Sequence, residues 1–135
     1  MPRDNINAAA DRLVAILGWE VCDDPQSLFD WAGRLGEHML LIPGEDPDDA
    51  RDAAAVGPRL AEVFRHRFDC AVVQTEADGA VRAMTGQRRV PTFVFFRDGR
   101  QLGAVGGALG WADRIARVQT ILECTPQPEP EPAFA

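Results

Sequence analysis

The stretch VPTFVFFRDG, residues 90–99, decides how this sequence is expected to fold. Its centre, TFVFF, is an apolar run of aromatic and β-branched residues, which is typical of a buried strand. Pro91 stands before the run, where a residue without a backbone N–H is tolerated, and Asp98-Gly99 closes it with the signal of a tight hairpin. The sequence therefore predicts a buried strand that turns back into residues 101–107, a glycine-weakened segment expected at a sheet edge.

Upstream of this hairpin, apolar segments of two kinds alternate. Short apolar runs bounded by turn residues predict three earlier strands, at 19–22, 38–44 and 70–75. Segments with apolar residues at helical spacing predict helices within 1–18, 24–36, 46–68, 76–86 and 111–123. Strands joined through helices call for a parallel crossover sheet, whereas the last two strands form an antiparallel hairpin. The predicted fold class is α/β, a three-layer α/β/α sandwich around a central mixed sheet.

Two helix starts carry the same signal, an aspartate followed by a proline. Asp24 and Asp46 are expected as N-caps, and Pro25 and Pro47 suit the first helical turn. The helix after Asp46 contains Pro58, which predicts one kinked helix rather than two. The buried stripe of that helix is predicted to be Ala53, Val56, Leu60 and Val63 or Phe64, and the core is predicted to include Trp31 and Trp111.

The length of 135 residues fits one domain with one main core. We expect an N-terminal helical extension over 1–18, the folded domain over 19–124 and a disordered tail over 125–135, which is rich in Pro and Glu. No stretch approaches the roughly 20 apolar residues of a membrane span. Asp4 and Asp11 interrupt the pattern of a signal peptide, so we expect a cytoplasmic protein without direct membrane insertion.

Composition excludes several classes of function. The net charge of −7 argues against nucleic acid and anionic membranes, and favours a basic partner. All 14 basic residues are arginine, so lysine Schiff-base catalysis is excluded. Cys22, Cys70 and Cys124 are too far apart for a disulfide framework or a zinc site, and the first two suit small buried hydrophobes. The sequence therefore predicts no catalytic residue, no metal site and no cofactor.

Between residues 19 and 123 the chain resembles the thioredoxin superfamily. The resemblance is carried by VPTFVFF, RDG and VGGALG, which lie between residues 90 and 110, and by Pro58 inside a helix. It implies a cis peptide bond before Pro91, although an ordinary trans proline at a strand start also fits the sequence. In that superfamily a Cys-x-x-Cys pair stands where this chain has residues 45–52, which contain no cysteine. Thiol–disulfide exchange at that position is therefore not expected.

One branch of the superfamily is more closely similar, the hydrogenase expression/formation family (HyaE/HupG-type). The similarity rests on chain length, an extra N-terminal helix, an acidic loop in place of Cys-x-x-Cys, and VPTFVFFRDGRQLGAVGGALGW. It implies a non-enzymatic chaperone for the small subunit of a membrane-bound uptake [NiFe]-hydrogenase. Such a protein would bind the small-subunit precursor and its twin-arginine signal peptide before export. The resemblance leaves open which hydrogenase is served and whether other hydrogenase accessory proteins take part.

Two neighbouring features form the candidate site for a peptide or partner. The loop 45–52 holds five acids and one arginine, a negative potential that would attract paired arginines. The main chain before Pro91 would pair with an extended peptide in the manner of an added strand. The candidate residues are Glu45, Asp46, Asp48, Asp49, Val90 and Pro91.

The same acids also suit the start of a helix. Asp46 is interpreted first as a cap, whereas a cap and a binding role stay equally open for Asp48 and Asp49. Arg88 and Arg89 stand beside the candidate main chain and would repel a basic peptide, so their role is open too.

Two alternative functions remain at this point. The chain could be a thiol oxidoreductase that uses a lone cysteine, which would require a thiol with a depressed pKa. It could also be a generic docking module that binds another protein through its sheet edge, without a peptide groove.

Overall fold

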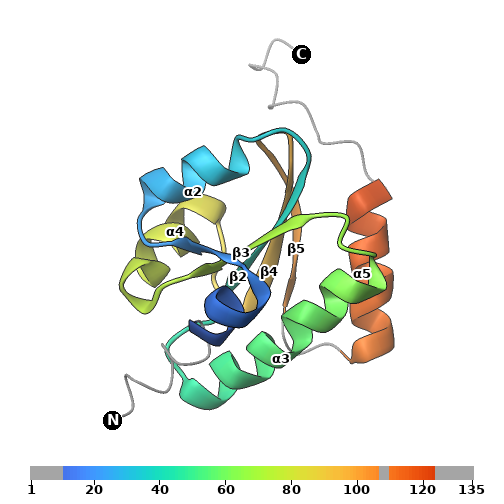
Figure 1. Ribbon diagram of the computed structural model, residues 1–135, viewed down its shortest axis with the longest axis horizontal. Coiled ribbons are helices and arrows are strands. Elements are labelled where there is room, and N and C mark those ends of the chain that lie inside the picture. Colours follow the sequence, from blue (N-terminus) through green and yellow to red (C-terminus); the bar gives the residue numbers. More distant parts are fainter. Residues whose placement is uncertain (1–10, 107–109, 124–135) are drawn as a thin grey trace.

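The order of the strands and helices follows the sequence prediction. The computed structural model describes residues 11–106 and 110–123 (Figure 1). The strands are β1 (Glu20–Cys22), β2 (Glu37–Ile42), β3 (Asp69–Val73), β4 (Thr92–Arg97) and β5 (Arg100–Gly106). The helices are α2 (Pro25–Ala32), α3 (Pro47–Val63), α4 (Asp78–Thr85) and α5 (Trp111–Glu123), with a 3₁₀ turn at Thr75–Ala77. Residues 11–17 are also helical, whereas residues 1–10 of the predicted N-terminal extension and the predicted tail lie outside the described residues.

The strands form one mixed sheet in the order β1-β3-β2-β4-β5. β1, β3 and β2 are parallel, and β4 runs antiparallel to both β2 and β5. This arrangement confirms the predicted sandwich, with β5 at an edge. Because the chain crosses between parallel strands through helices, both faces of the sheet are covered.

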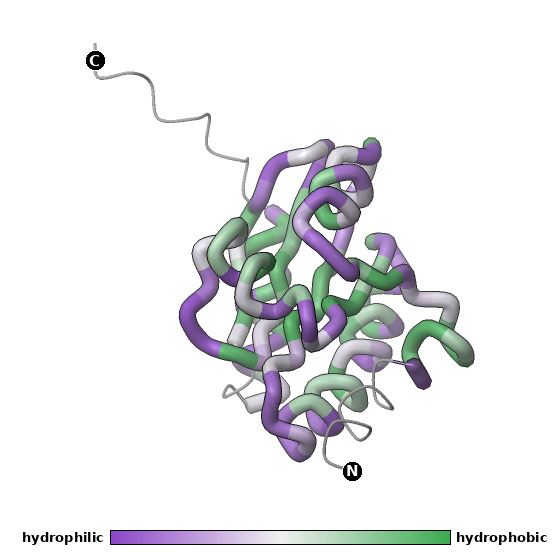
Figure 2. Tube along the Cα trace, turned by 90° about the vertical axis from the view of Figure 1, so that its left-hand side faces the viewer, coloured by the Kyte–Doolittle hydropathy of each residue, from purple (hydrophilic) through white to green (hydrophobic). Residues whose placement is uncertain are grey.

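Two hydrophobic clusters lie on opposite faces of the sheet, which the alternation along β4 shows. Phe93 and Phe95 point to the face covered by α3, α5 and residues 11–17. Val94 and Phe96 point to the face covered by α2 and α4. The hydrophobic residues gather in the interior and the hydrophilic ones along the outer turns (Figure 2).

Local signals in the sequence set the helix and hairpin ends as expected. Asp24 and Ser27 form a capping box at α2, and the Asp46 carboxylate accepts hydrogen bonds from two backbone N–H groups at the start of α3. The hairpin residues Asp98 and Gly99 both have positive φ, at 51° and 85°. That conformation is typical of a two-residue turn that matches the twist of the strands.

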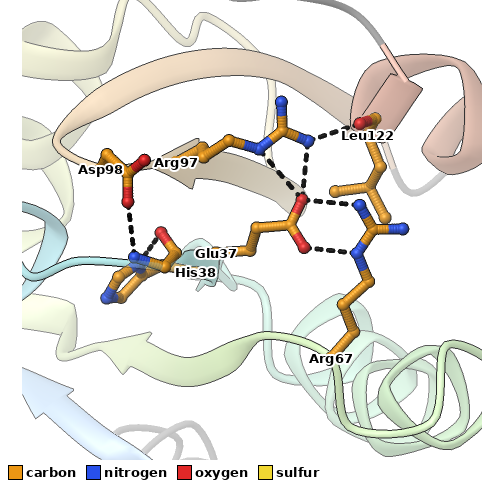
Figure 3. A network of polar contacts seen from close by, with 7 residues as sticks. Glu37, His38, Arg67, Arg97, Asp98 and Leu122 are labelled. Atoms are coloured by element: carbon orange, nitrogen blue, oxygen red, sulfur yellow. Dashed lines mark hydrogen bonds and ion pairs between the residues drawn. The ribbon is translucent and has the colours of Figure 1, made fainter.

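A charged cluster lies at the hairpin end of the sheet (Figure 3). The Glu37 carboxylate accepts hydrogen bonds from the guanidinium groups of Arg67 and Arg97. Arg97 also donates to the main-chain carbonyl of Leu122, near the end of α5. Burial alone would raise the pKa of Glu37, but the hydrogen bonds and charges of both arginines outweigh burial and lower it. The cluster therefore connects β2, β4, the end of α5 and the loop after α3.

The packing predictions hold in part. Ala53 and Leu60 of the predicted α3 stripe are buried, and Val56 and Phe64 are partly buried against the same cluster, whereas Val63, the alternative to Phe64, is 45% exposed. Ala50, Gly57 and Ala61 complete the buried face of α3. Trp111 is only partly buried, with the Arg59 guanidinium 4.2 Å from its ring centre, whereas Trp31 lies in the core as predicted. In the described part of the chain, no helix is both long and apolar enough to cross a membrane.

Candidate functional site

The loop between β2 and α3 packs against the residue that precedes Pro91. Pro43 and Gly44 are buried, and Gly44 has a φ of +83°. A Cβ added at Gly44 would lie 2.6 Å from Cγ2 of Val90, so glycine permits both the backbone conformation and the close approach. The beginning of α3 is thereby held beside the strand that starts at Thr92.

The Val90–Pro91 peptide bond is cis, as the resemblance to the thioredoxin superfamily implies. Immediately after it, Thr92 donates its hydroxyl to the main-chain carbonyl of Val105 at 3.2 Å. Thr92 is also paired with Gly106 in the register of β4 and β5. The beginning of β4 and the end of β5 therefore meet beside the start of α3.

A groove of about 590 Å³ opens between α3, α5 and the segment around Pro91. Its volume lies within the usual range for ligand sites. Asp49 and Asp52 of α3 form what we call the acidic wall, and Arg89, Arg114 and Arg117 form the basic wall. The apolar lining comes from Ala53, Val56, Val90, Pro91 and Phe93. The groove thus offers side chains of both charges above an apolar surface.

The structure brings three of the six predicted site residues into this groove, namely Asp49, Val90 and Pro91. Asp46 serves as the helix cap, because its carboxylate accepts from the N–H groups of Asp48 and Asp49 at 2.9 and 3.1 Å. Asp48 is exposed and its carboxylate lies 3.3 Å from the Arg51 guanidinium. Asp46 and Asp48 are thus engaged at the helix start and do not line the groove.

Glu45 is exposed and lies close enough to α4 for its charge to raise the pKa of a buried carboxyl group there, that of Asp78. Asp78 is 2% exposed, and its Oδ2 lies 2.9 Å from Nε of Arg82. Burial raises the pKa of Asp78, the charge of Arg82 opposes that effect, and the charge of Glu45 adds to it. Glu45 is consequently placed on the side of α4.

Four charged groove residues were missing from the predicted site: Asp52, Arg89, Arg114 and Arg117. Asp52 lies three residues after Asp49 on the same helical face, a spacing that the sequence shows directly. Arg114 stands four residues before the buried Val118 and is therefore a charged residue on the apolar face of α5. The sequence spacing alone could have identified it as unusual. Its place next to α3 depends on how the two helices pack, which the sequence pattern does not specify.

Neither described cysteine lies in the groove. Burial, with the help of nearby acids, raises the pKa of Cys22 to about 12, and burial together with Asp69 raises that of Cys70 to about 12. Both thiols are therefore protonated at neutral pH and poor nucleophiles. Cys124 lies outside the described residues. Within 11–106 and 110–123, no group of three His, Cys, Asp or Glu side chains is arranged to hold a metal ion.

Residues 9–114 match the family model described as hydrogenase-1 expression protein HyaE. The hydrogenase expression/formation protein HupG of Rhodobacter capsulatus is 35% identical over 123 residues, which cover 90% of this chain and 89% of that protein. The hydrogenase expression/formation protein HoxO of Cupriavidus necator is 31% identical over 104 residues, covering 73% of this chain and 64% of HoxO.

Solved structures with the same architecture include thioredoxins. That of Fasciola hepatica matches with a TM-score of 0.60 at 19% identity, over 76% of this chain and 96% of the thioredoxin. A designed protein matches with a TM-score of 0.59 at 23% identity, over 76% of this chain and 87% of that one. At these identities the similarity establishes a thioredoxin-like fold alone.

Proposed function

Because this chain belongs to the HyaE family of hydrogenase expression proteins, we propose that it is a non-redox accessory protein in the maturation of a membrane-bound uptake [NiFe]-hydrogenase. It binds the small-subunit precursor in the cytoplasm, through the twin-arginine signal peptide and before export. It acts by binding alone, as a chaperone, and requires no cofactor.

The groove beside Pro91 is the observation that carries this proposal. A twin-arginine signal peptide presents an extended basic segment followed by an apolar one. Asp49 and Asp52 can pair with arginines, and the apolar lining around Val56 and Phe93 suits the residues that follow. Val90 is partly exposed, and its main chain can accept an added strand.

The raised pKa values of Cys22, which is buried, and of Cys70, which is partly buried, favour this function over a thiol oxidoreductase. A lone-cysteine enzyme needs a thiolate at neutral pH, whereas Cys22 and Cys70 each have a pKa of about 12. In a Cys124→Ser background, thiol reagents at pH 8 should therefore label the two remaining cysteines only as fast as the protein opens. Labelling of the folded protein at the rate of a free thiol would instead favour the oxidoreductase.

The proposal is tested by calorimetric titration with a synthetic small-subunit signal peptide and a copy whose two arginines are glutamines. We expect the native peptide to bind and the copy to bind far more weakly, with an affinity that falls as salt rises. If the two peptides bind equally well, the acidic wall does not recognise the arginine pair. If neither binds, recognition of the signal peptide is wrong and the partner must be sought in a folded protein.

Variants on α3 locate the contact. Asp49→Asn/Asp52→Asn should weaken binding roughly three- to thirtyfold, since exposed ion pairs contribute about 0.3–1 kcal/mol each. Glu62→Gln removes one exposed charge from the far end of the same helix and is the matched control. Asp48→Asn should have a smaller effect than Asp49→Asn because Asp48 does not line the groove. An equal effect at Asp48 would show that overall charge, rather than the groove, decides binding.

A further inference from the structure

The groove is lined by charges of opposite sign that are not paired with each other. Asp49 and Asp52 form one wall, and Arg89 and Arg117 contribute to the other. All four side chains belong to exposed residues. Among the residues that the structure describes, no ion pair joins either aspartate to either of these arginines. Their charges are therefore available to a bound molecule.

Elsewhere in this protein, opposite charges that come close do pair. Arg34 lies 2.9 Å from Glu20, and Arg97 lies 2.6 Å from Glu37. In the groove, the aspartates stand on α3, whereas Arg117 stands on α5 and Arg89 in the segment before Pro91, with the apolar lining between these elements. A ligand that fills this space would meet an acidic side and a basic side at once.

Arg114 adds depth to the basic wall. Only 6% of this residue is exposed, although it also lines the groove. Burial lowers the pKa of its guanidinium, which nevertheless stays charged at neutral pH because arginine titrates far above that range. Its charge adds to the positive potential of the basic wall, whereas the contacts to a bound carboxylate are assigned to the two exposed arginines.

We infer that Arg89 and Arg117 of the basic wall form a carboxylate subsite, so that the peptide bound in the groove carries an acidic side chain close to its basic pair. This inference rests on the proposed function and limits the ligand to a segment that carries both charges. Arginine recognises carboxylates through paired N–H donors, and these two exposed arginines supply such donors. It also gives Arg89 a role, since a purely basic peptide would be repelled there.

The size of the groove limits the spacing between the two charges. A volume of 590 Å³ corresponds to a cavity about 10 Å across if it is roughly spherical. An extended chain advances about 3.3 Å per residue, so the acid lies within about three residues of the basic pair. An acid much farther along the chain would fall outside the groove.

Four short peptides test the inference independently of the full signal peptide. Each is a capped, extended 12-residue peptide. The first has Arg-Arg with Glu two residues away, and the second has Gln in place of that Glu. The third keeps the Glu but moves it eight residues away, which leaves composition and net charge unchanged. The fourth has Gln-Gln in place of Arg-Arg. Affinities are measured by fluorescence polarisation for the wild-type protein and for two variants, Arg89→Gln/Arg117→Gln and the control Arg100→Gln.

We expect the first peptide to bind wild type roughly three- to tenfold more tightly than the second and the third. In Arg89→Gln/Arg117→Gln this preference should disappear, while the dependence on the arginine pair persists. Arg100 lies at the hairpin end of β5, away from the groove, so Arg100→Gln should behave as wild type. Exposed sites are chosen so that the variants keep their fold.

The outcomes separate this inference from the proposed function. If the second and third peptides bind as tightly as the first, the carboxylate subsite is refuted, although arginine-dependent binding of the signal peptide would leave the proposed function intact. If the first peptide binds with both dependences but the signal peptide does not, the subsite stands and the proposed function fails. If none of these peptides binds, both are wrong.

Discussion

Replacing Gly44 by alanine should destabilise the loop that positions the groove. The change in the free energy of unfolding follows from the backbone angle at Gly44 and from one close contact. The φ of +83° costs a residue with a Cβ about 1–2 kcal/mol. The added methyl would meet Val90 at 2.6 Å, an overlap that costs about 1–3 kcal/mol in a well-packed place. Alanine also stiffens the unfolded chain, which returns about 0.5–1 kcal/mol. We therefore expect Gly44→Ala to lower the free energy of unfolding by about 2–4 kcal/mol.

Gly86→Ala is the matched control for the backbone contribution. Gly86 has a φ of +74°, but a Cβ there would touch nothing within 4 Å. Its cost should therefore contain the conformational part alone, about 1 kcal/mol. Val90→Ala in the Gly44→Ala background removes the nearest atom and should recover about 1 kcal/mol.

Urea unfolding followed by tryptophan fluorescence is measured for five proteins: wild type, the single variants Gly44→Ala, Gly86→Ala and Val90→Ala, and the double variant Gly44→Ala/Val90→Ala. The midpoint and the slope are fitted together. The reasoning is refuted if Gly44→Ala costs no more than Gly86→Ala. It is refuted as well if Val90→Ala and Gly44→Ala are simply additive, since two residues in steric conflict must show a coupling energy.

Two further changes probe the parts of the molecule away from the groove. Glu37→Gln should lower the free energy of unfolding by about 1–3 kcal/mol at pH 7. Because the pKa of Glu37 is lowered in the folded state, this contribution exists above its unfolded pKa and is lost as pH falls through the folded value. The urea midpoints of wild type and variant should therefore converge in acid, and a constant difference would contradict the ion pairing. His66→Gly should raise the free energy of unfolding by about 0.5–1 kcal/mol in the same assay, because His66 is exposed and has a φ of +55° that glycine adopts without strain. An unchanged or lower urea midpoint would show that the imidazole makes a compensating contact.

Signals confined to neighbouring residues predicted the fold well. The Asp24 and Asp46 caps and the Asp98-Gly99 turn each depend on a side chain and a backbone a few residues apart, so the sequence contains everything that they need. Of the two alternatives for the end of the α3 stripe, Phe64 packs against the core and Val63 does not, because helical spacing identifies a face but not where along the helix the sheet ends. The fold class followed from the alternation of strands and helices, which topology rules turn into a small set of arrangements.

Only half of the predicted site residues line the groove, since the groove depends on two helices that are distant in sequence. Asp49 and Pro91 were found because each stands beside a local signal, a helix start and a strand start. Arg117 was not found because nothing near it in the sequence indicates that α5 lies across from α3. The buried Asp78 was missed for the same reason: it follows a turn in the sequence, and packing against the loop before α3 buries it.

The hydrogen bond from Arg97 to the main-chain carbonyl of Leu122 holds α5 near its C-terminal end. Arg114 lies eight residues from that anchor, an arm of about 12 Å at 1.5 Å per residue. Turning the helix by about 5° about the anchor moves Arg114 by about 1 Å, and therefore changes the distance between the acidic and basic walls by a similar amount. The width of the groove and the ion pairing around Glu37 therefore share one helix, although they lie at opposite ends of the sheet, so a displacement of α5 would affect both.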